Sequence, residues 1–223
     1  TTGMSVSVVN PTIEDVTNTF SRYDDIAAVI IEPTGADFGQ LPIHVPEFLE
    51  NLCSIVHRHK SLLIMDEVVT GFRLSPGGVQ GMYNINPDLT TLAKIVAGGL
   101  PGGVVGGKSD ILDMISFTED SDWNNIRRIK HPGTFNGNPM SAAAGRKCLE
   151  LISAGQFNST ADDMARRLKN GINDVFSSKG VDGHAYGLGS IIHVAFSNCT
   201  CNREICLMAH AEIKRAIDPE IMI

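Results

Sequence analysis

Several protein classes are excluded by what this chain of 223 residues lacks. It contains no apolar run of about 18 residues or more, so we expect no membrane-spanning helix. It has no long basic patch, and its 25 acidic side chains outnumber 18 basic ones, so nucleic acid is not an expected partner. The first residues show no signal-peptide pattern. The 43% hydrophobic content and 22 glycines that remain are ordinary for a packed α/β enzyme.

Cysteine is scarce, and its five positions do not suggest a disulfide framework. Five is an odd number, so we expect reduced thiols and a cytoplasmic location. The group Cys199, Cys201 and Cys206 lacks a second pair of ligands, and we therefore predict no metal site. The sequence opens on Thr1 without an initiator methionine, so we expect the N-terminus, with any organellar targeting segment, to be missing.

Two apolar segments each deliver one charged side chain, and they are the most informative part of the sequence. Residues 62–66 (LLIMD) are typical of a buried parallel strand that ends at Asp66. Residues 90–97 (TTLAKIVA) surround Lys94 with apolar and small side chains. A lysine with little water around it loses proton affinity and becomes a nucleophilic amine. An acid and a desolvated lysine together suit pyridoxal phosphate (PLP), with Lys94 as the Schiff-base amine and Asp66 beside the ring nitrogen.

The hydrophobic pattern predicts a βαβ unit and a parallel sheet in an α/β domain. A change of character near residue 155 divides the chain into residues 1–155, part of a large PLP-binding domain, and residues 156–223, part of a C-terminal small domain. The expected elements are helix 11–23 with Thr12 as N-cap, buried strand 27–31, helix 46–59, strand 62–65, strand 87–92, strand 104–107, helix 108–115, exposed loop 117–128, helix 138–151 packed through small residues, helix 158–178 and strand 188–196.

Three ordered motifs carry a resemblance to a known family. They are residues 66–73 (DEVVTGFR), 87–94 (PDLTTLAK) and 132–139 (PGTFNGNP). Together they resemble the class III PLP-dependent aminotransferases, in particular the branch that includes glutamate-1-semialdehyde 2,1-aminomutase. The resemblance covers residues 26–152 and continues more weakly to residue 196. It implies fold type I, with a mostly parallel sheet in the large domain, part of a smaller α+β domain, and a homodimer with shared active sites.

The resemblance also implies roles for particular residues. Asp66 pairs with the pyridine nitrogen, and Val68 packs on one face of the ring. Lys94 forms the Schiff base and shuttles a proton, and Thr134 reaches the cofactor phosphate of the neighbouring subunit. Taken singly, each has an ordinary structural alternative: Asp66 as a helix N-cap, Lys94 as an exposed lysine at a strand end, and Thr134 as a turn residue.

Substrate contacts are less sharply indicated. Asp37 lies where many class III aminotransferases carry an acid and aminomutases usually do not, so it meets a substrate amine or a gating arginine, or it is a solvated loop acid. Arg73 binds a substrate carboxylate or forms a structural salt bridge. Val69 replaces a glutamine found in many class III transaminases. Residues 134–139 (TFNGNP) depart from the Thr-Leu-Ser-Gly-Asn-Pro pattern of aminomutases.

The sequence therefore predicts a PLP-dependent aminotransferase that moves an amino group from an amino acid or amine to a keto acid or aldehyde. One alternative is an isomerase of the glutamate-1-semialdehyde 2,1-aminomutase type, and a weaker one is a PLP-dependent racemase or epimerase. Another is a truncated, non-catalytic paralogue that dimerises or regulates a partner, because family members run to about twice this length and their phosphate loop would precede Thr1.

Overall fold

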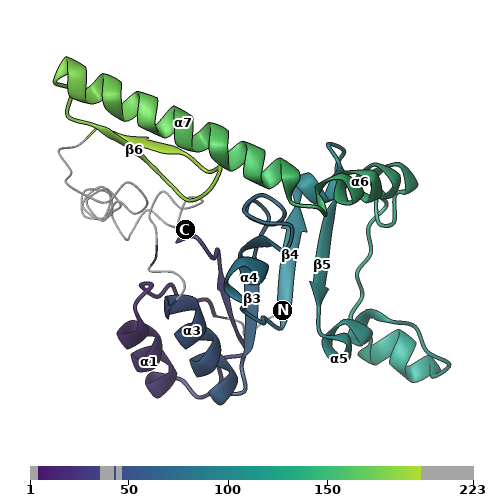
Figure 1. Ribbon diagram of the computed structural model, residues 1–223. Coiled ribbons are helices and arrows are strands. Elements are labelled where there is room, and N and C mark those ends of the chain that lie inside the picture. The colour runs from purple at the N-terminus through teal and green to yellow at the C-terminus, as the bar shows by residue number, and fades with distance from the viewer. Residues whose placement is uncertain (1–4, 36–42, 44–46, 197–223) are drawn as a thin grey trace.

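The computed structural model describes residues 5–35, 43 and 47–196, which form two sheets with helices around them (Figure 1). In chain order the elements are α1 (Ile13–Arg22), β1 (Ala28–Ile31), α3 (Glu47–Arg58), β3 (Leu62–Asp66), α4 (Gly78–Tyr83), β4 (Leu89–Ala93), the 3-10 turn η1 (Lys94–Ala97), β5 (Gly103–Gly107), α5 (Ser109–Leu112), η2 (Asp113–Ile115), the π-helical turn η3 (Trp123–Arg127), α6 (Pro139–Ile152), α7 (Gln156–Lys179), β6 (His184–Tyr186) and β7 (His193–Ala195).

The larger sheet has the strand order β1-β3-β4-β5. Its first three strands are parallel, and β5 runs antiparallel to β4. The predicted βαβ unit is confirmed by β1, α3 and β3, and the sheet is mostly parallel as expected. Parallel strands bring their carboxyl ends to one edge, which is where open α/β sheets bind ligands. Strand β3 reaches that edge at Asp66.

The core lies between this sheet and the helices α1 and α3. Helix α1 begins after Thr12, whose hydroxyl accepts a hydrogen bond from the backbone N–H of Asp15 at 3.1 Å, as predicted for its N-cap. The apolar faces of the two helices meet alternate residues of β3. The buried side chains that make these contacts include Val16, Phe20, Leu49, Leu52, Val56, Leu63 and Met65.

The opposite face of β1 is more open than the sequence predicts. We expected a buried strand, but Ala28 and Ile30 are exposed, with Ile30 at 64%. Val29 and Ile31 face the core on the other side. Successive side chains of a strand point to opposite faces, and α1 and α3 cover only one of them. The prediction failed because a continuous apolar run shows that a strand is hydrophobic on both faces. It does not show whether helices of the same chain cover both of them.

The second sheet is the hairpin of β6 and β7, which packs against α7 (Figure 1). The predicted strand over residues 188–196 is confirmed only at its end, because the preceding residues bend. Gly187 and Gly189 adopt φ values of 124° and 53°, which break an extended backbone. The predicted helix at 108–115 is divided into α5 and η2, and the exposed segment 117–128 contains η3.

Two sequence features need only a brief statement. Within residues 5–35, 43 and 47–196, no helix combines the length and apolar character needed to cross a membrane. The group Cys199, Cys201 and Cys206 lies outside the described residues.

Candidate active site

Side chains from three neighbouring strands meet at the carboxyl edge of the larger sheet. Glu32 follows β1 directly, Asp66 ends β3, and Thr91 lies near the end of β4. The register pairs Ile31 with Met65 and Asp66 with Thr91, so Glu32 and Asp66 occupy neighbouring positions. The alternation of side chains places all three on the face opposite α1 and α3. This edge of the sheet therefore collects two carboxyls and a hydroxyl.

The carboxylate of Asp66 is held in one orientation. Its Oδ1 accepts hydrogen bonds from the backbone N–H of Val68 at 3.1 Å and from the hydroxyl of Thr91 at 3.1 Å. In the part of the chain that the structure describes, Oδ2 accepts no hydrogen bond. Asp66 is only half-buried. The arrangement fixes the side chain and leaves one oxygen for an external cationic donor.

Lys94 follows β4 immediately and begins the turn η1. Its φ of 53° is in the left-handed region, which few residues other than glycine adopt, and such backbone strain concentrates at functional sites. The side chain is exposed, so the desolvated lysine that we expected is not formed by the described residues. The apolar neighbours that suggested desolvation pack beneath the turn instead, and Ala97 is buried there.

Helix α6 supports this turn from below. A Cβ atom added to Gly145 of α6 would collide with the carbonyl oxygen of Val96, and one added to Gly98 would collide with that of Ala144. The hydroxyl of Ser141 donates to the carbonyl oxygen of Pro101 at 2.7 Å. The small residues predicted to allow close packing of this helix therefore bring its backbone against η1 and position Lys94.

Glu32 is a residue of this edge to which the sequence analysis gave no role. Its carboxyl oxygens accept from the Thr34 hydroxyl at 2.9 and 2.7 Å, and one also accepts from the Thr34 backbone N–H at 3.0 Å. The pKa of Glu32 is raised to about 7, mainly by burial and in smaller part by the charge of Asp66, against the lowering effect of these bonds and of the Gly35 N–H. The available signal was its position, because it follows a predicted strand just as Asp66 does.

Glu67 follows Asp66 but points to the opposite face, where it is fully buried. Its carboxylate accepts from the Thr70 hydroxyl at 2.9 Å and from the Val79 backbone N–H at 2.7 Å. The backbone and side-chain amides of Gln80 both donate to it at 3.0 Å. These four bonds join the loop after β3 to α4, so Glu67 supports the site from beneath.

The remaining predicted site residues are less closely grouped. Val68 is half-buried next to Asp66, whereas Thr134 is exposed in the turn that precedes α6. Among the described residues, no hydrogen bond joins Thr134 to Asp66, and the exposed Arg73 forms no ion pair. Asp37 lies outside the described residues.

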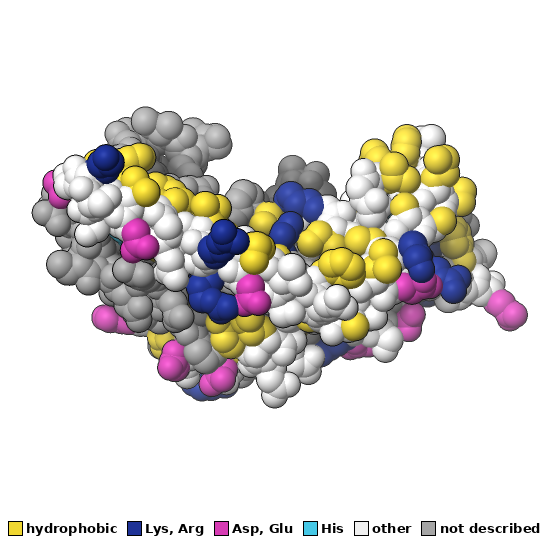
Figure 2. Space-filling model, turned by 45° about the horizontal axis from the view of Figure 1, so that its top comes forward, with side chains coloured by type: hydrophobic (Ala, Val, Ile, Leu, Met, Phe, Trp, Pro, Cys, Tyr) yellow, Lys and Arg dark blue, Asp and Glu magenta, His cyan; other side chains and the backbone are white. Residues whose placement is uncertain are grey.

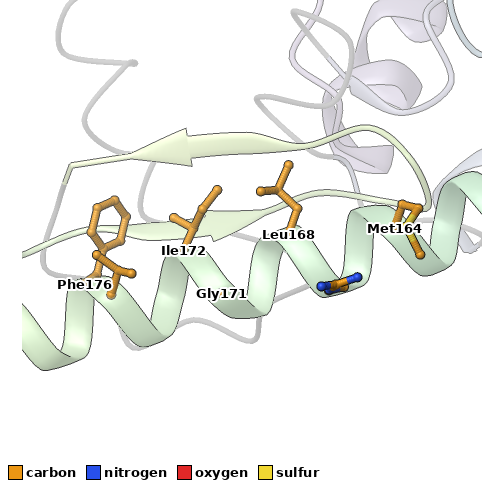
Figure 3. A pocket seen from close by; sticks show the side chains of 7 residues that line it. Met164, Leu168, Gly171, Ile172 and Phe176 are labelled. Atoms are coloured by element: carbon orange, nitrogen blue, oxygen red, sulfur yellow. The ribbon is translucent and has the colours of Figure 1, made fainter.

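An apolar groove lies elsewhere, along α7 (Figure 3). Hydrophobic side chains over α7 are visible on the molecular surface (Figure 2). The residues that line the groove are Met164, Arg167, Leu168, Gly171, Ile172, Val175 and Phe176. None of them belongs to β1, β3 or β4, and Arg167 is the one ionisable side chain among them, so the groove does not carry the chemistry of the sheet edge.

Comparisons with known proteins agree with the motifs. A family model described as "Aminotransferase class-III" matches residues 5–212. A glutamate-1-semialdehyde 2,1-aminomutase of Pyrobaculum calidifontis is 45% identical over 159 residues, which are 71% of this chain and 34% of that protein. The enzyme of the same name from Methanococcoides burtonii is 37% identical over 194 residues, 86% of this chain and 43% of that protein.

The fold has a counterpart among solved structures. A transaminase with PLP bound superposes with a TM-score of 0.73 at 25% identity, over 83% of this chain and 42% of that one. This likeness agrees with the predicted fold type I architecture. The chain spans less than half the length of each of these three proteins.

Proposed function

This chain belongs to the class III aminotransferases, a PLP-dependent family, and from that premise we propose that it is part of an enzyme of the glutamate-1-semialdehyde 2,1-aminomutase type. The observation that carries the proposal is the joint placement of Asp66 and Lys94 at the ends of adjacent strands, in a chain whose relatives bear that name. Similarity thus favours the isomerase over the transfer between two molecules that we expected first.

The residues present fit PLP as a cofactor. The Oδ2 of Asp66, which accepts no hydrogen bond from the described residues, would accept from a cationic ring nitrogen. Val68 N–H and the Thr91 hydroxyl donate to Oδ1 and hold the carboxylate in place. Lys94 presents its amine on the exposed side of η1, from which it would link covalently to the cofactor. Val68 would pack on the ring, and Thr134 would reach the phosphate of the cofactor held by a second copy in a homodimer.

Each residue of this set has a chemical task. When bound, PLP supplies a cationic ring that accepts the electron pair left on a substrate carbon. Asp66 stabilises the positive charge of the ring nitrogen. The Nζ atom of Lys94 takes the proton from the substrate carbon and returns a proton later in the cycle. Arg73 would bind a carboxylate of the small-molecule substrate, and Asp37 would meet its amine.

Transfer between two molecules is the second candidate. It is favoured by the acid at Asp37, which aminomutases usually lack, and by the likeness to a solved transaminase. An aminomutase moves the amino group within one substrate and needs no separate acceptor. Feeding a nitrogen-labelled amino donor with and without an added keto acid separates the two: label in the keto acid supports a transferase, and relocation without acceptor supports the isomerase.

The first test concerns attachment of the cofactor to the full chain. We predict that PLP added to the protein gives a new absorbance band that borohydride reduction fixes covalently to Lys94. In Lys94→Ala the band and the covalent label disappear. Lys147→Ala is the matched control, because this exposed lysine of α6 pairs with Glu150 at the surface and should leave the label in place. Labelling of another lysine would contradict the assignment.

A further inference from the structure

Two carboxyl groups sit side by side at the carboxyl edge of the sheet, and the proposed function uses only one of them. Glu32 directly follows Ile31, whose partner on the adjacent parallel strand is Met65, so the next position of the register places Glu32 beside Asp66 on the same face. Glu32 is half-buried, and the nearly buried Thr34 holds both of its oxygens. The arrangement places the charge of Asp66 beside the Glu32 carboxyl, whose pKa it raises.

We propose that Glu32 and Asp66 form a coupled pair, in which Glu32 keeps its proton beside ionised Asp66 and releases that proton to solvent when a cation binds Asp66. Glu32 is then a positioning residue that acts through Asp66. For the cofactor the inference rests on the proposed function, because the cation is the protonated ring nitrogen. The pair itself requires only the residues of this chain.

Glu32 keeps its proton because of its surroundings. Burial raises the pKa of Glu32 to about 7, and the negative charge of Asp66 acts in the same direction. Thr34 and the N–H of Gly35 lower it without reversing that shift. Among the charged groups within the described residues, Asp66 is the one that acts on Glu32. Glu32 therefore titrates near neutral pH.

A cation at Asp66 reverses the effect on its neighbour. The added positive charge offsets the negative charge of Asp66, so ionisation of Glu32 becomes easier and its proton leaves. The ionised pair then faces the cation with two negative charges instead of one. By linkage, binding of the cation to this edge is strengthened as the pH rises through about 7, the pKa of Glu32.

The coupling is tested first without any cofactor. In the full chain carrying carbon-13 at the glutamate side-chain carboxyls, the Glu32 signal, assigned through Glu32→Gln, should titrate near pH 7. Asp66→Asn should lower its midpoint, by less than burial raises it, because it removes the negative charge that opposes ionisation of Glu32. Asparagine retains the oxygen that accepts from Val68 and Thr91, so the fold of this variant should be preserved. Thr34→Ala should raise the midpoint, because it removes a hydroxyl donor.

If Glu32 had a purely structural role, the result would be different. Removal of the Asp66 charge would then leave the Glu32 midpoint unchanged, and the coupled pair would be refuted. If Asp66→Asn does not fold, Asp66→Ser serves instead, since its hydroxyl can accept the same donors. A Glu32 midpoint near the ordinary value of 4.5 in the wild type would refute the proposal as well.

A second measurement brings in the cofactor. PLP added at pH 7 in weak buffer should release about half a proton more per chain from the wild type than from Glu32→Gln, because about half of Glu32 is protonated there. Equal release with PLP bound would overturn the proton-release step. If PLP does not bind while the Asp66→Asn shift is present, the proposed function fails and the coupled pair stands, so the two failures are distinct.

Discussion

At the scale of single residues, Glu67 beneath the site is expected to contribute more to folding than Glu32 and Asp66 within it. Glu67 is fully buried and accepts four hydrogen bonds from Thr70, Val79 and Gln80. Buried donors that lose their partner cost about 1–3 kcal/mol each. Gly78, with a φ of 66°, lies so close to the carboxylate that a side chain there would displace it. The loop between β3 and α4 therefore depends on this one side chain.

We predict that Glu67→Ala lowers the free energy of unfolding by about 3 kcal/mol or more, because several donors are left unpaired inside the protein. Urea unfolding followed by circular dichroism measures the change. Glu150→Ala is the control, since this exposed acid of α6 pairs with Arg146 and Lys147 at the surface and should cost less than about 1 kcal/mol. Equal losses in the two variants would show that the buried carboxylate does not hold the loop.

Residues that end an apolar run could be predicted from the sequence, whereas those that act through three-dimensional partners could not. The end of β3 at Asp66 was predictable, because the pattern of a parallel strand marks where its carboxyl end lies. The exposure of Lys94 was not, because sequence neighbours do not show which side of a turn a side chain occupies. The raised pKa of Glu32 was not predictable either, because it comes mainly from burial in the fold and in smaller part from the charge of Asp66, 34 positions away in sequence.

At the scale of elements, α6 packs closely against the turn that carries Lys94. Gly145 faces the carbonyl oxygen of Val96, with no space for a Cβ atom. Gly171, in the interior of α7, has open space around it. Both are helical glycines, and alanine in an open helix position is more stable by about 0.5–1 kcal/mol. The same substitution should therefore have opposite effects at the two sites.

We predict that Gly145→Ala destabilises the chain by about 1–3 kcal/mol through overpacking, and that it weakens the covalent linkage of PLP by displacing η1. Gly171→Ala should raise stability by about 0.5–1 kcal/mol and leave the linkage unchanged. Unfolding midpoints and the yield of borohydride-fixed PLP check both effects. A stabilised Gly145→Ala with normal linkage would show that α6 does not position Lys94.

The elements themselves were largely predictable, and the exceptions have physical causes. The periodic patterns of α3, α6 and α7 were sufficient to locate these helices. The antiparallel direction of β5 was not predictable, since its five residues contain three glycines and little pattern. Strand β6 was missed for a similar reason, because only three residues of it are extended. Short elements depend on tertiary contacts that the local sequence does not show.

At the scale of the whole molecule, the two sheets fall on either side of the expected boundary. Strands β1, β3, β4 and β5 lie before residue 155, and the hairpin of β6 and β7 lies after it with α7. We retain the division into residues 1–155 and 156–223 as a proposal. The two parts are joined near the site, because the Asn158 side chain donates to the backbone carbonyls of Phe72 at 2.8 Å and Arg73 at 2.9 Å.

Two of the exposed apolar surfaces within the described residues are candidates for the contact between copies in the proposed homodimer. One lies around the turn before α6, where Phe135 is 67% exposed and Met140 71% exposed. The other is the groove along α7, which includes the exposed Val175 (Figure 3). If Thr134 reaches the cofactor phosphate of a second copy, then its neighbour Phe135 lies close to that copy. The proposed function thus favours the surface before α6.

We predict that Phe135→Asp raises the dissociation constant of the dimer at least about tenfold, because an apolar anchor is replaced by a charge that must lose its water. Sedimentation equilibrium of the full chain gives this constant. Val175→Asp on α7 is the matched control and should leave it unchanged. If Val175→Asp dissociates the dimer and Phe135→Asp does not, the copies meet through α7, and Thr134 is too far from the second copy to hold its phosphate. Because the two variants add the same charge at similarly exposed sites, a general loss of solubility would affect both alike, and only a specific interface separates them.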